Sequence, residues 1–252
     1  MIKTTSLLFV FLLSLNAPNP PDKRSIRCFT KSFRLAIGDS LGNYATMPTM
    51  MDDERVFVCG DLQMIEYVTH SMEHRPPDPD RYEDRYSYLV FEKDSLTGIE
   101  YEAKWPDSTR RRSVDFATKA RRMNDALVVN LLGRQPHLVS SVQDPKSGML
   151  TEIYTRLGDG GRDVDTCRLY FSKTLEGLPS FESLSPYLDS ARGVRLFEVR
   201  CTIDSGFSKE KNTMCPKSEL LWKVEEKAFF NRDSIYGYFT RYARECQGTD
   251  GR

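Results

Sequence analysis

The sequence lacks an excess of charge of either sign, because 36 Lys and Arg side chains balance 36 Asp and Glu side chains over 252 residues. A general nucleic-acid-binding protein needs a net basic face, so we expect no nucleic-acid partner. The mean hydropathy of −0.50 excludes a protein with many membrane spans. The hydrophobic fraction of 39% still supplies enough core-forming residues for a folded globular protein.

Several short motifs are also absent. No Asn-x-Ser/Thr triplet occurs, so N-glycans are not expected. No Cys-x-x-Cys pair occurs, which argues against a structural zinc knuckle and against a thioredoxin-type redox site. The chain contains only 3 histidines, which leaves few positions for histidine-based catalysis or metal binding. We expect no bound cofactor.

Long apolar runs are absent except at the N-terminus, where Ser6–Leu15 forms an apolar stretch after Lys3. The stretch is too short to cross a bilayer core of ~30 Å and is typical of the central region of a signal peptide. Ala17 supplies a small residue at the cleavage position. We therefore predict a signal peptide over residues 1–17 and one secreted, extracellular β-rich domain over 18–252, with no membrane span.

The six cysteines all lie in the segment predicted to be secreted, and an even number in a secreted chain predicts three disulfides. Sequence alone leaves many pairings open. Residue alternation places Cys167 and Cys201 on the inner faces of two strands, and Cys246 ends the apolar stripe of a C-terminal helix. The favoured pairs are Cys28–Cys59, Cys167–Cys201 and Cys215–Cys246.

Alternating apolar and polar residues joined by short turns predict β-hairpins. Gly60-Asp61 separates two such runs, and two further hairpins turn at residues 94–98 and 144–148, each with an Asp-x-x-Thr/Ser-Gly pattern. The Asp side chain of each turn can bond the backbone two residues on. We expect the closing Gly of each turn to take the positive φ that returns the chain.

Two helices complete the predicted fold. Ser113 is a suitable cap for a helix to about Asn130, and an apolar stripe predicts a helix over 233–246, whereas the segment 220–230 fits a strand or a helix. We expect an α+β, β-rich fold, stapled by disulfides, in which a hairpin-built antiparallel sheet or a lipocalin-like barrel packs against a mid-chain helix and a C-terminal helix. The Gly-x-Trp signature of lipocalins is absent, so this likeness concerns shape alone.

The segment HSMEH, residues 70–74, resembles the His-x-x-Glu-His motif of inverzincin metalloproteases. The resemblance implies a helix on which His70 and His74 bind zinc and Glu73 acts as general base, with Glu152 as a distant third ligand. The context favours a strand, because the preceding residues alternate and an Arg-Pro-Pro follows. On a strand the two histidines would lie ~13 Å apart, too far for one metal ion.

The segment GDSL, residues 38–41, follows an apolar strand and resembles the nucleophile block of GDSL esterases. The resemblance implies that Ser40 is a nucleophile at a sharp turn, activated by a histidine base, and Asn124-Asp125 resembles the Asn-Asp of their oxyanion hole. That family places an Asp-x-x-His late in the chain, but no histidine follows His137. The alternative is a strand that ends in an Asx-type turn.

Two groups of side chains suit binding surfaces. The basic group is Arg110, Arg111, Arg112, Lys119 and Arg122, just before and along the expected mid-chain helix. The aromatic group is Tyr86, Tyr88, Tyr101 and Trp105. The basic group would attract an anionic glycan, an acidic protein or a phosphate group, and the aromatic group combines area with polar tips. The simpler interpretation of the basic group is a solvated helix face, and that of the aromatic group is filling of the core.

These observations leave three functional hypotheses. The favoured one is a secreted, non-enzymatic binding module for a small apolar ligand or a partner protein. The second is a secreted hydrolase that uses the 70–74 segment or Ser40. The third is an extracellular structural or interaction protein without a pocket. An apolar cavity of ~300 Å³ or more would favour the small ligand, and a filled interior would favour the interaction protein.

Overall fold

The computed structural model describes residues 22–38, 44–46, 54–73, 81–103, 109–115, 128, 132, 136–156, 164–175, 177–208 and 213–247. The predicted signal peptide and Ser40 therefore lie outside the described residues. Within the described part of the chain, no helix is long and apolar enough to cross a membrane.

Strands make up most of the described residues. They are β1 (Arg27–Gly38), β2 (Tyr44–Thr46), β3 (Glu54–Cys59), β4 (Leu62–Glu73), β5 (Arg81–Glu92), β6 (Thr97–Glu102), β7 (Thr109–Ser113), β8 (Pro136–Gln143), β9 (Leu150–Arg156), β10 (Val164–Ser172), β11 (Arg195–Ile203), β12 (Gly206–Ser208), β13 (Thr213–Cys215) and β14 (Ser218–Glu226). The helical elements are η2 (Lys23–Ser25), η3 (Ser180–Glu182), α4 (Pro186–Arg192) and α5 (Arg232–Gln247). The segment 220–230, which fits either class by sequence, is thus mostly strand.

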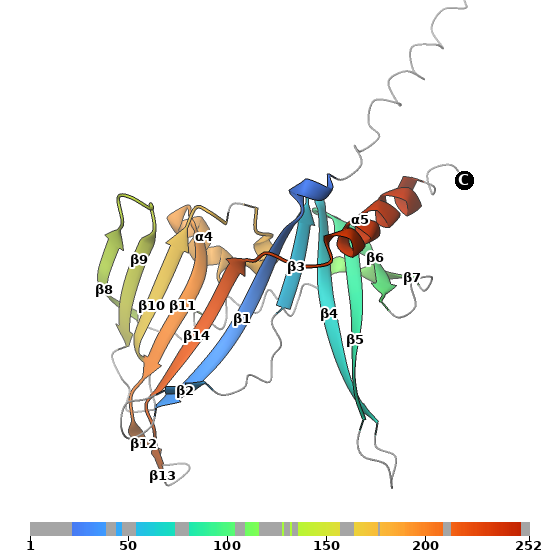
Figure 1. The fold of residues 1–252 in the computed structure, drawn as a ribbon. Helices are drawn as coiled ribbons and strands as arrows, with labels where there is room; N and C mark the ends of the chain where they lie inside the picture. The colour runs from blue at the N-terminus through green and yellow to red at the C-terminus, as the bar shows by residue number, and fades with distance from the viewer. Residues whose placement is uncertain are drawn as a thin grey trace, which may run out of the picture.

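Eleven strands follow one antiparallel path in the order β7-β6-β5-β4-β3-β1-β14-β11-β10-β9-β8 (Figure 1). The short β2 pairs with β1 beside this path, and β12 and β13 form a separate hairpin. Most neighbours are consecutive hairpin partners, and β1 joins the two halves by pairing with both β3 and β14. The β-rich, hairpin-built antiparallel sheet expected from the sequence is confirmed.

The sheet is open, so the lipocalin-like barrel is wrong. In the described part of the chain, β7 and β8 end the strand path, and the two strands lie at opposite sides of the molecule (Figure 1). Arginine side chains of the kind that protect a sheet edge lie along β7, whereas the edge-disrupting features of β8 are confined to its first half. β7 contains three consecutive arginines, and β8 begins at Pro136 and has a register shift between Leu138 and Ser140.

The turns explain how the hairpins close. Gly60 and Gly148 have φ of 61° and 68°, which the tight turns of the β3–β4 and β8–β9 hairpins require. Asp144 accepts hydrogen bonds from the Lys146 amide and the Ser147 hydroxyl, which confirms the expected Asx-type turn. The expectation for Gly98 is wrong. In the β5–β6 turn Asp94 takes the positive φ, of 66°, and Gly98 belongs to β6.

Buried side chains pack on both faces of the sheet. On β3–β6, α5 covers one face through Ile235, Phe239 and Tyr242, which confirms the predicted C-terminal helix and its stripe. The opposite face of these strands packs against Val114 and Phe181. On the other half, α4 and the segment leading to it cover an apolar cluster over β9, β10, β11 and β14.

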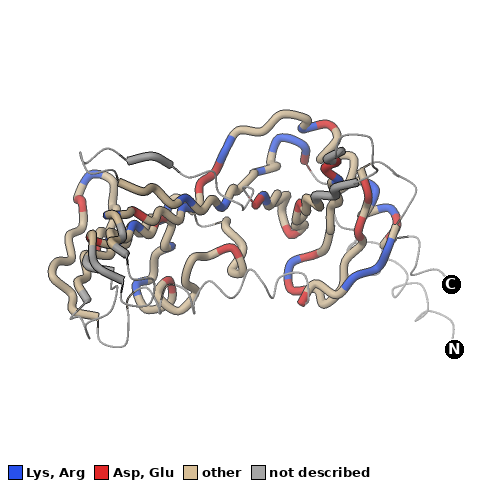
Figure 2. Tube along the Cα trace, turned by 90° about the horizontal axis from the view of Figure 1, so that it is seen from below, with Lys and Arg blue, Asp and Glu red and all other residues tan. Residues whose placement is uncertain are grey.

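The predicted mid-chain helix falls mainly outside the described residues. Val114, Asp115 and Val128, the described residues between Ser113 and Asn130, are helical, and Val114 and Val128 are buried. The three arginines just before the expected helix, Arg110–Arg112, belong to β7. Figure 2 shows that Lys and Arg are interspersed with Asp and Glu along the trace, in keeping with the neutral total charge.

Candidate functional site

The edge strand β8 exposes an unusual set of side chains. Leu138, Val139 and Val142 have 43%, 56% and 62% of their surface exposed, although all three are apolar. The strand reads PHLVSSVQ and contains no Asp, Glu, Lys or Arg, whereas 29% of the whole chain is charged. Because β8 ends the strand path, its outer N–H and C=O groups have no ladder partner among the described residues. We call this strand the β8 edge.

The strand at the opposite edge of the sheet, β7, is strongly charged. β7 reads TRRRS, and Arg110 and Arg111 are exposed. Arg110 lies opposite Glu100 on β6, and the guanidinium of Arg112 forms an ion pair with the same carboxylate. Part of the basic group is therefore neutralised within the sheet, and Lys119 and Arg122 lie outside the described residues.

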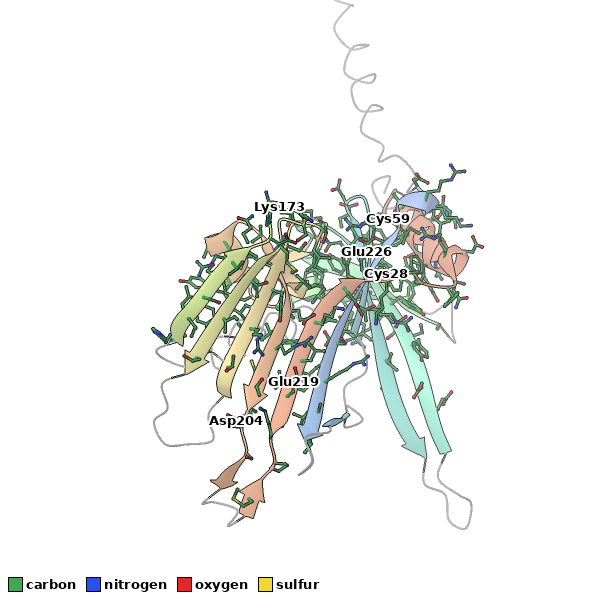
Figure 3. The ribbon with its side chains drawn as sticks, turned by 60° about the vertical axis from the view of Figure 1, so that its left-hand side comes forward. Cys28, Cys59, Lys173, Asp204, Glu219 and Glu226 are labelled. Carbon is green, nitrogen blue, oxygen red and sulfur yellow. The ribbon has the colours of Figure 1, made fainter. Side chains whose placement is uncertain are left out.

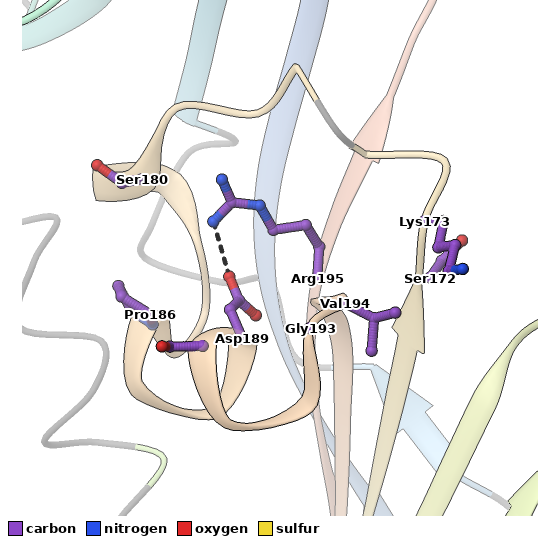
Figure 4. Close-up of a pocket in the computed structure, with 9 residues that line it drawn as sticks. Ser172, Lys173, Ser180, Pro186, Asp189, Gly193, Val194 and Arg195 are labelled. Atoms are coloured by element: carbon purple, nitrogen blue, oxygen red, sulfur yellow. Dashed lines mark hydrogen bonds and ion pairs between the residues drawn. The ribbon is translucent and has the colours of Figure 1, made fainter.

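A cleft of about 380 Å³ opens where α4 meets the ends of β10 and β11 (Figure 4). It is lined by Ser172, Lys173, Ser180, Pro186, Asp189, Ser190, Gly193, Val194 and Arg195. Only Pro186 and Val194 contribute apolar side chains. Because Lys173, Asp189 and Arg195 also border the cleft, its lining is mixed and is not purely apolar.

The charged groups of the cleft hold its wall together. Asp189 accepts hydrogen bonds from the Ser183 hydroxyl at 2.6 Å, the Arg195 guanidinium at 2.9 Å and the Leu196 amide at 2.7 Å. Figure 4 shows Arg195 reaching across to Asp189. These contacts use the carboxylate to fix α4 to β11, so Asp189 has a structural role.

The aromatic group anchors α5 on the sheet. Tyr88 and Tyr101 lie opposite each other on β5 and β6, and the Tyr238 ring of α5 packs on both, with centroids at 4.6 Å and 5.5 Å. The Arg241 guanidinium lies over the Tyr101 ring. Tyr101 is fully buried, whereas Tyr86 is 37% exposed. The core-filling interpretation therefore holds for Tyr88 and Tyr101, and Trp105 lies outside the described residues.

A buried carboxylate lies beside this aromatic group. Glu66 is ion-paired with Arg55 at 2.6 Å and lies close to Tyr88. Burial raises the pKa of Glu66 above its ordinary value, in spite of the attraction of Arg55. Burial, together with the negative charge of Glu66, raises the pKa of Tyr88 to about 12. Tyr88 is thus neutral at physiological pH.

The zinc interpretation of residues 70–74 requires a helix, and the structure shows a strand. β4 is extended to Glu73 and pairs with β5 throughout, with His70 opposite Asp84 and Glu73 opposite Arg81. His74 lies outside the described residues. Glu152, the imagined third ligand, is on β9, with five strands between it and β4. Its buried carboxylate binds the Arg192 guanidinium at 2.7 Å and the Tyr154 hydroxyl at 2.8 Å.

No pair of described cysteines lies at S–S bonding distance, so the disulfide staples are not present in the structure. Cys167 and Cys201 come closest, with their Sγ atoms 2.6 Å apart. Cys28 and Cys59 lie near the α5 end of the sheet (Figure 3). The pairing Cys215–Cys246 is wrong, because β13 and α5 lie at opposite ends of the molecule (Figure 1).

Sequence reasoning missed two of these features. The predicted elements include no helix over Pro186–Arg192, although Ser185 caps this helix, Pro186 follows and Gly193 ends it with φ of 66°. The Ser-Pro pair at the start of this helix and the Gly after it are sequence features that predict a helix start and a helix end. Sequence reasoning predicted the β8 hairpin but not its place at the end of the sheet, which depends on non-local pairing.

Comparison with family models, with curated proteins and with solved structures finds no match.

Proposed function

We propose that the chain is a secreted, non-enzymatic interaction protein that docks through the β8 edge. The observation that carries the proposal is that Leu138, Val139 and Val142 are exposed on an uncharged strand at the end of the sheet. Such an edge recruits another strand through main-chain hydrogen bonds, and its apolar side chains add buried area. The N-terminal apolar run Ser6–Leu15 supports the proposed secretion.

The proposed occupant of the β8 edge is β8 of a second copy. In an antiparallel pair related by a two-fold axis, each residue of Pro136–Gln143 faces a residue of the same strand. Because this strand carries no charge, no like charges meet. The arginines of β7 would instead repel their own copies. A two-fold β8 pair uses both β8 edges, so it closes as a dimer and does not grow into a filament.

The other hypotheses receive less support. The extended path of β4 through His70 and Glu73 does not provide the helix on which a zinc hydrolase of the expected type depends. The described cleft is bordered by the charged side chains of Lys173, Asp189 and Arg195, and two of the described apolar clusters are buried beneath α4 and α5. The exposed apolar side chains of β8 therefore favour a partner protein over a small apolar ligand.

The oligomeric state of the purified protein tests this proposal. We expect sedimentation equilibrium between ~1 and ~100 μM to show a reversible monomer–dimer equilibrium. Val142→Lys places a charge on the edge of each copy, and we expect it to weaken the dimer at least tenfold, on the order of 1.4 kcal/mol. The substitution is at an exposed position, so at concentrations where both proteins are monomeric the midpoint of urea unfolding should change little.

Leu96→Lys is the matched control, because Leu96 is 77% exposed and lies in the β5–β6 turn, away from β8. We expect this variant to dimerise like the original chain. A monomer at every concentration would overturn the proposal, as would a dimer that Val142→Lys leaves unchanged. Open-ended polymers would show that β8 pairs with β7 of another copy. Dimerisation only in the presence of a different protein would assign the edge to another partner.

A further inference from the structure

Cys167 and Cys201 are placed directly opposite each other in the sheet. The antiparallel register of β10 and β11 pairs the two residues, and their Sγ atoms are 2.6 Å apart. This separation exceeds the S–S bond length of ~2.05 Å by only about 0.5 Å. Both side chains are at most 2% exposed and lie in the apolar cluster beneath α4. A small movement of the side chains therefore suffices for bonding.

The other described cysteines lack this arrangement. Cys28 on β1 lies opposite Phe57, whereas Cys59 is two residues further along β3, so the two cysteines are diagonal neighbours. Diagonal neighbours in a sheet lie ~7–8 Å apart, beyond the usual reach of a disulfide. Cys59 contacts the Ser25 hydroxyl and the Asp22 carbonyl, and Cys246 is on α5.

We infer that Cys167 and Cys201 form a disulfide bond between β10 and β11 in the secreted protein. The two thiols lose two protons and two electrons to a small-molecule disulfide such as oxidised glutathione. The S–S bond of that oxidant breaks and gives two thiols, by way of a mixed disulfide. The inference uses the oxidising compartment of the proposed secretion, but it does not depend on the β8 edge.

The surroundings of the pair determine when the bond forms. A hydrogen bond between the two thiols, together with burial, raises the pKa of Cys167, so little thiolate exists in the folded state. Thiolate is the attacking species, so oxidation should occur while β10 and β11 are still accessible during folding. The same burial then shields the finished bond from external reductants.

Peptide mapping under non-reducing conditions tests the inference. Reduced, unfolded protein is refolded with a glutathione redox couple, and free thiols are alkylated in denaturant without reductant. We expect tryptic peptides 163–168 and 201–209 to appear as one linked species, which reductant separates. Cys246→Ser is the control and should retain the link. Alkylated Cys167 and Cys201, or a link from Cys167 to another cysteine, would overturn the inference.

A thermal measurement checks the effect of the bond. The two cysteines are 34 residues apart, and a cross-link of that span should raise the melting temperature by about 10 °C. We expect oxidised protein to melt higher than Cys167→Ala/Cys201→Ala, with a smaller gap after reduction. Protein that reaches the culture medium without the link would refute the disulfide and leave secretion standing. If refolded protein carries the link but the protein never reaches the medium, the disulfide would be confirmed and secretion would be refuted.

Discussion

Single residues with opposite electrostatic surroundings should give the protein opposite responses to pH. Burial raises the pKa of Glu66, whereas two hydrogen bonds from the Arg27 guanidinium, at 3.0 Å and 2.7 Å, lower the pKa of Glu226. Both start from an ordinary value of 4.5. The folded state therefore holds the proton of Glu66 more tightly, and that of Glu226 less tightly, than the unfolded chain does.

These directions predict how each residue contributes to stability. The contribution of Glu66 is present below pH 4.5 and is lost as the pH rises through its folded pKa. The contribution of Glu226 is present above pH 4.5 and is lost as the pH falls through its folded pKa. Measured by urea unfolding between pH 3 and 7, the free-energy advantage of the original chain over Glu66→Gln should shrink as the pH rises.

Glu226→Gln provides the comparison for this measurement. The advantage of the original chain over this variant should grow as the pH rises. Because both variants replace a carboxylate by the isosteric amide, changes common to all Glu→Gln substitutions cancel in the comparison. Slopes of the same sign for both variants would contradict the assigned surroundings.

At the scale of elements, two glycines illustrate opposite demands of strand and helix. A Cβ at Gly98 on β6 would lie 2.5 Å from the Val90 carbonyl oxygen and 3.0 Å from the Phe91 Cβ. A Cβ at Gly237 on α5 would meet nothing within 4 Å. The first glycine is required by close packing of β5 on β6, whereas the second only weakens the helix.

We therefore expect alanine at the two positions to have opposite effects. Gly98→Ala forces backbone to move and should lower the free energy of unfolding by about 2 kcal/mol. Gly237→Ala should raise it by ~0.5–1 kcal/mol, because alanine restricts the unfolded chain and favours the helix. Urea unfolding of both variants measures this. Equal losses would show that α5 does not tolerate the added methyl group.

The local elements were predictable from the sequence, and their assembly was not. The Asp144 turn, the Gly60 turn and the α5 stripe follow from side-chain chemistry within a few residues, and each is confirmed. The open sheet depends on the pairing of β1 with β14, which are far apart in the chain. For the same reason the sequence indicated Tyr88 and Tyr101 as a binding surface, although Tyr238 on α5 covers them.

At the scale of the whole molecule, the sheet connects two packed halves. One apolar cluster lies over β9, β10, β11 and β14, and two others lie on the faces of β3–β6. Val58 on β3 packs against both the first cluster and the one around Leu89. β1 pairs with both halves without a break in the ladder. Such continuity favours a single cooperative unit over two independent ones.

This continuity predicts that a substitution that destabilises one half of the sheet destabilises the other half equally. Leu89 is fully buried on β5, and Leu89→Ala should lower the free energy of unfolding by about 3 kcal/mol. Trp105→Phe leaves Trp222 as the sole tryptophan, which lies on β14 with three strands between it and β5. In that background, Leu89→Ala should shift the urea midpoint reported by Trp222 fluorescence as far as the one reported by circular dichroism. If the Trp222 midpoint stays in place while the circular dichroism transition splits, the halves unfold separately and the chain contains two domains.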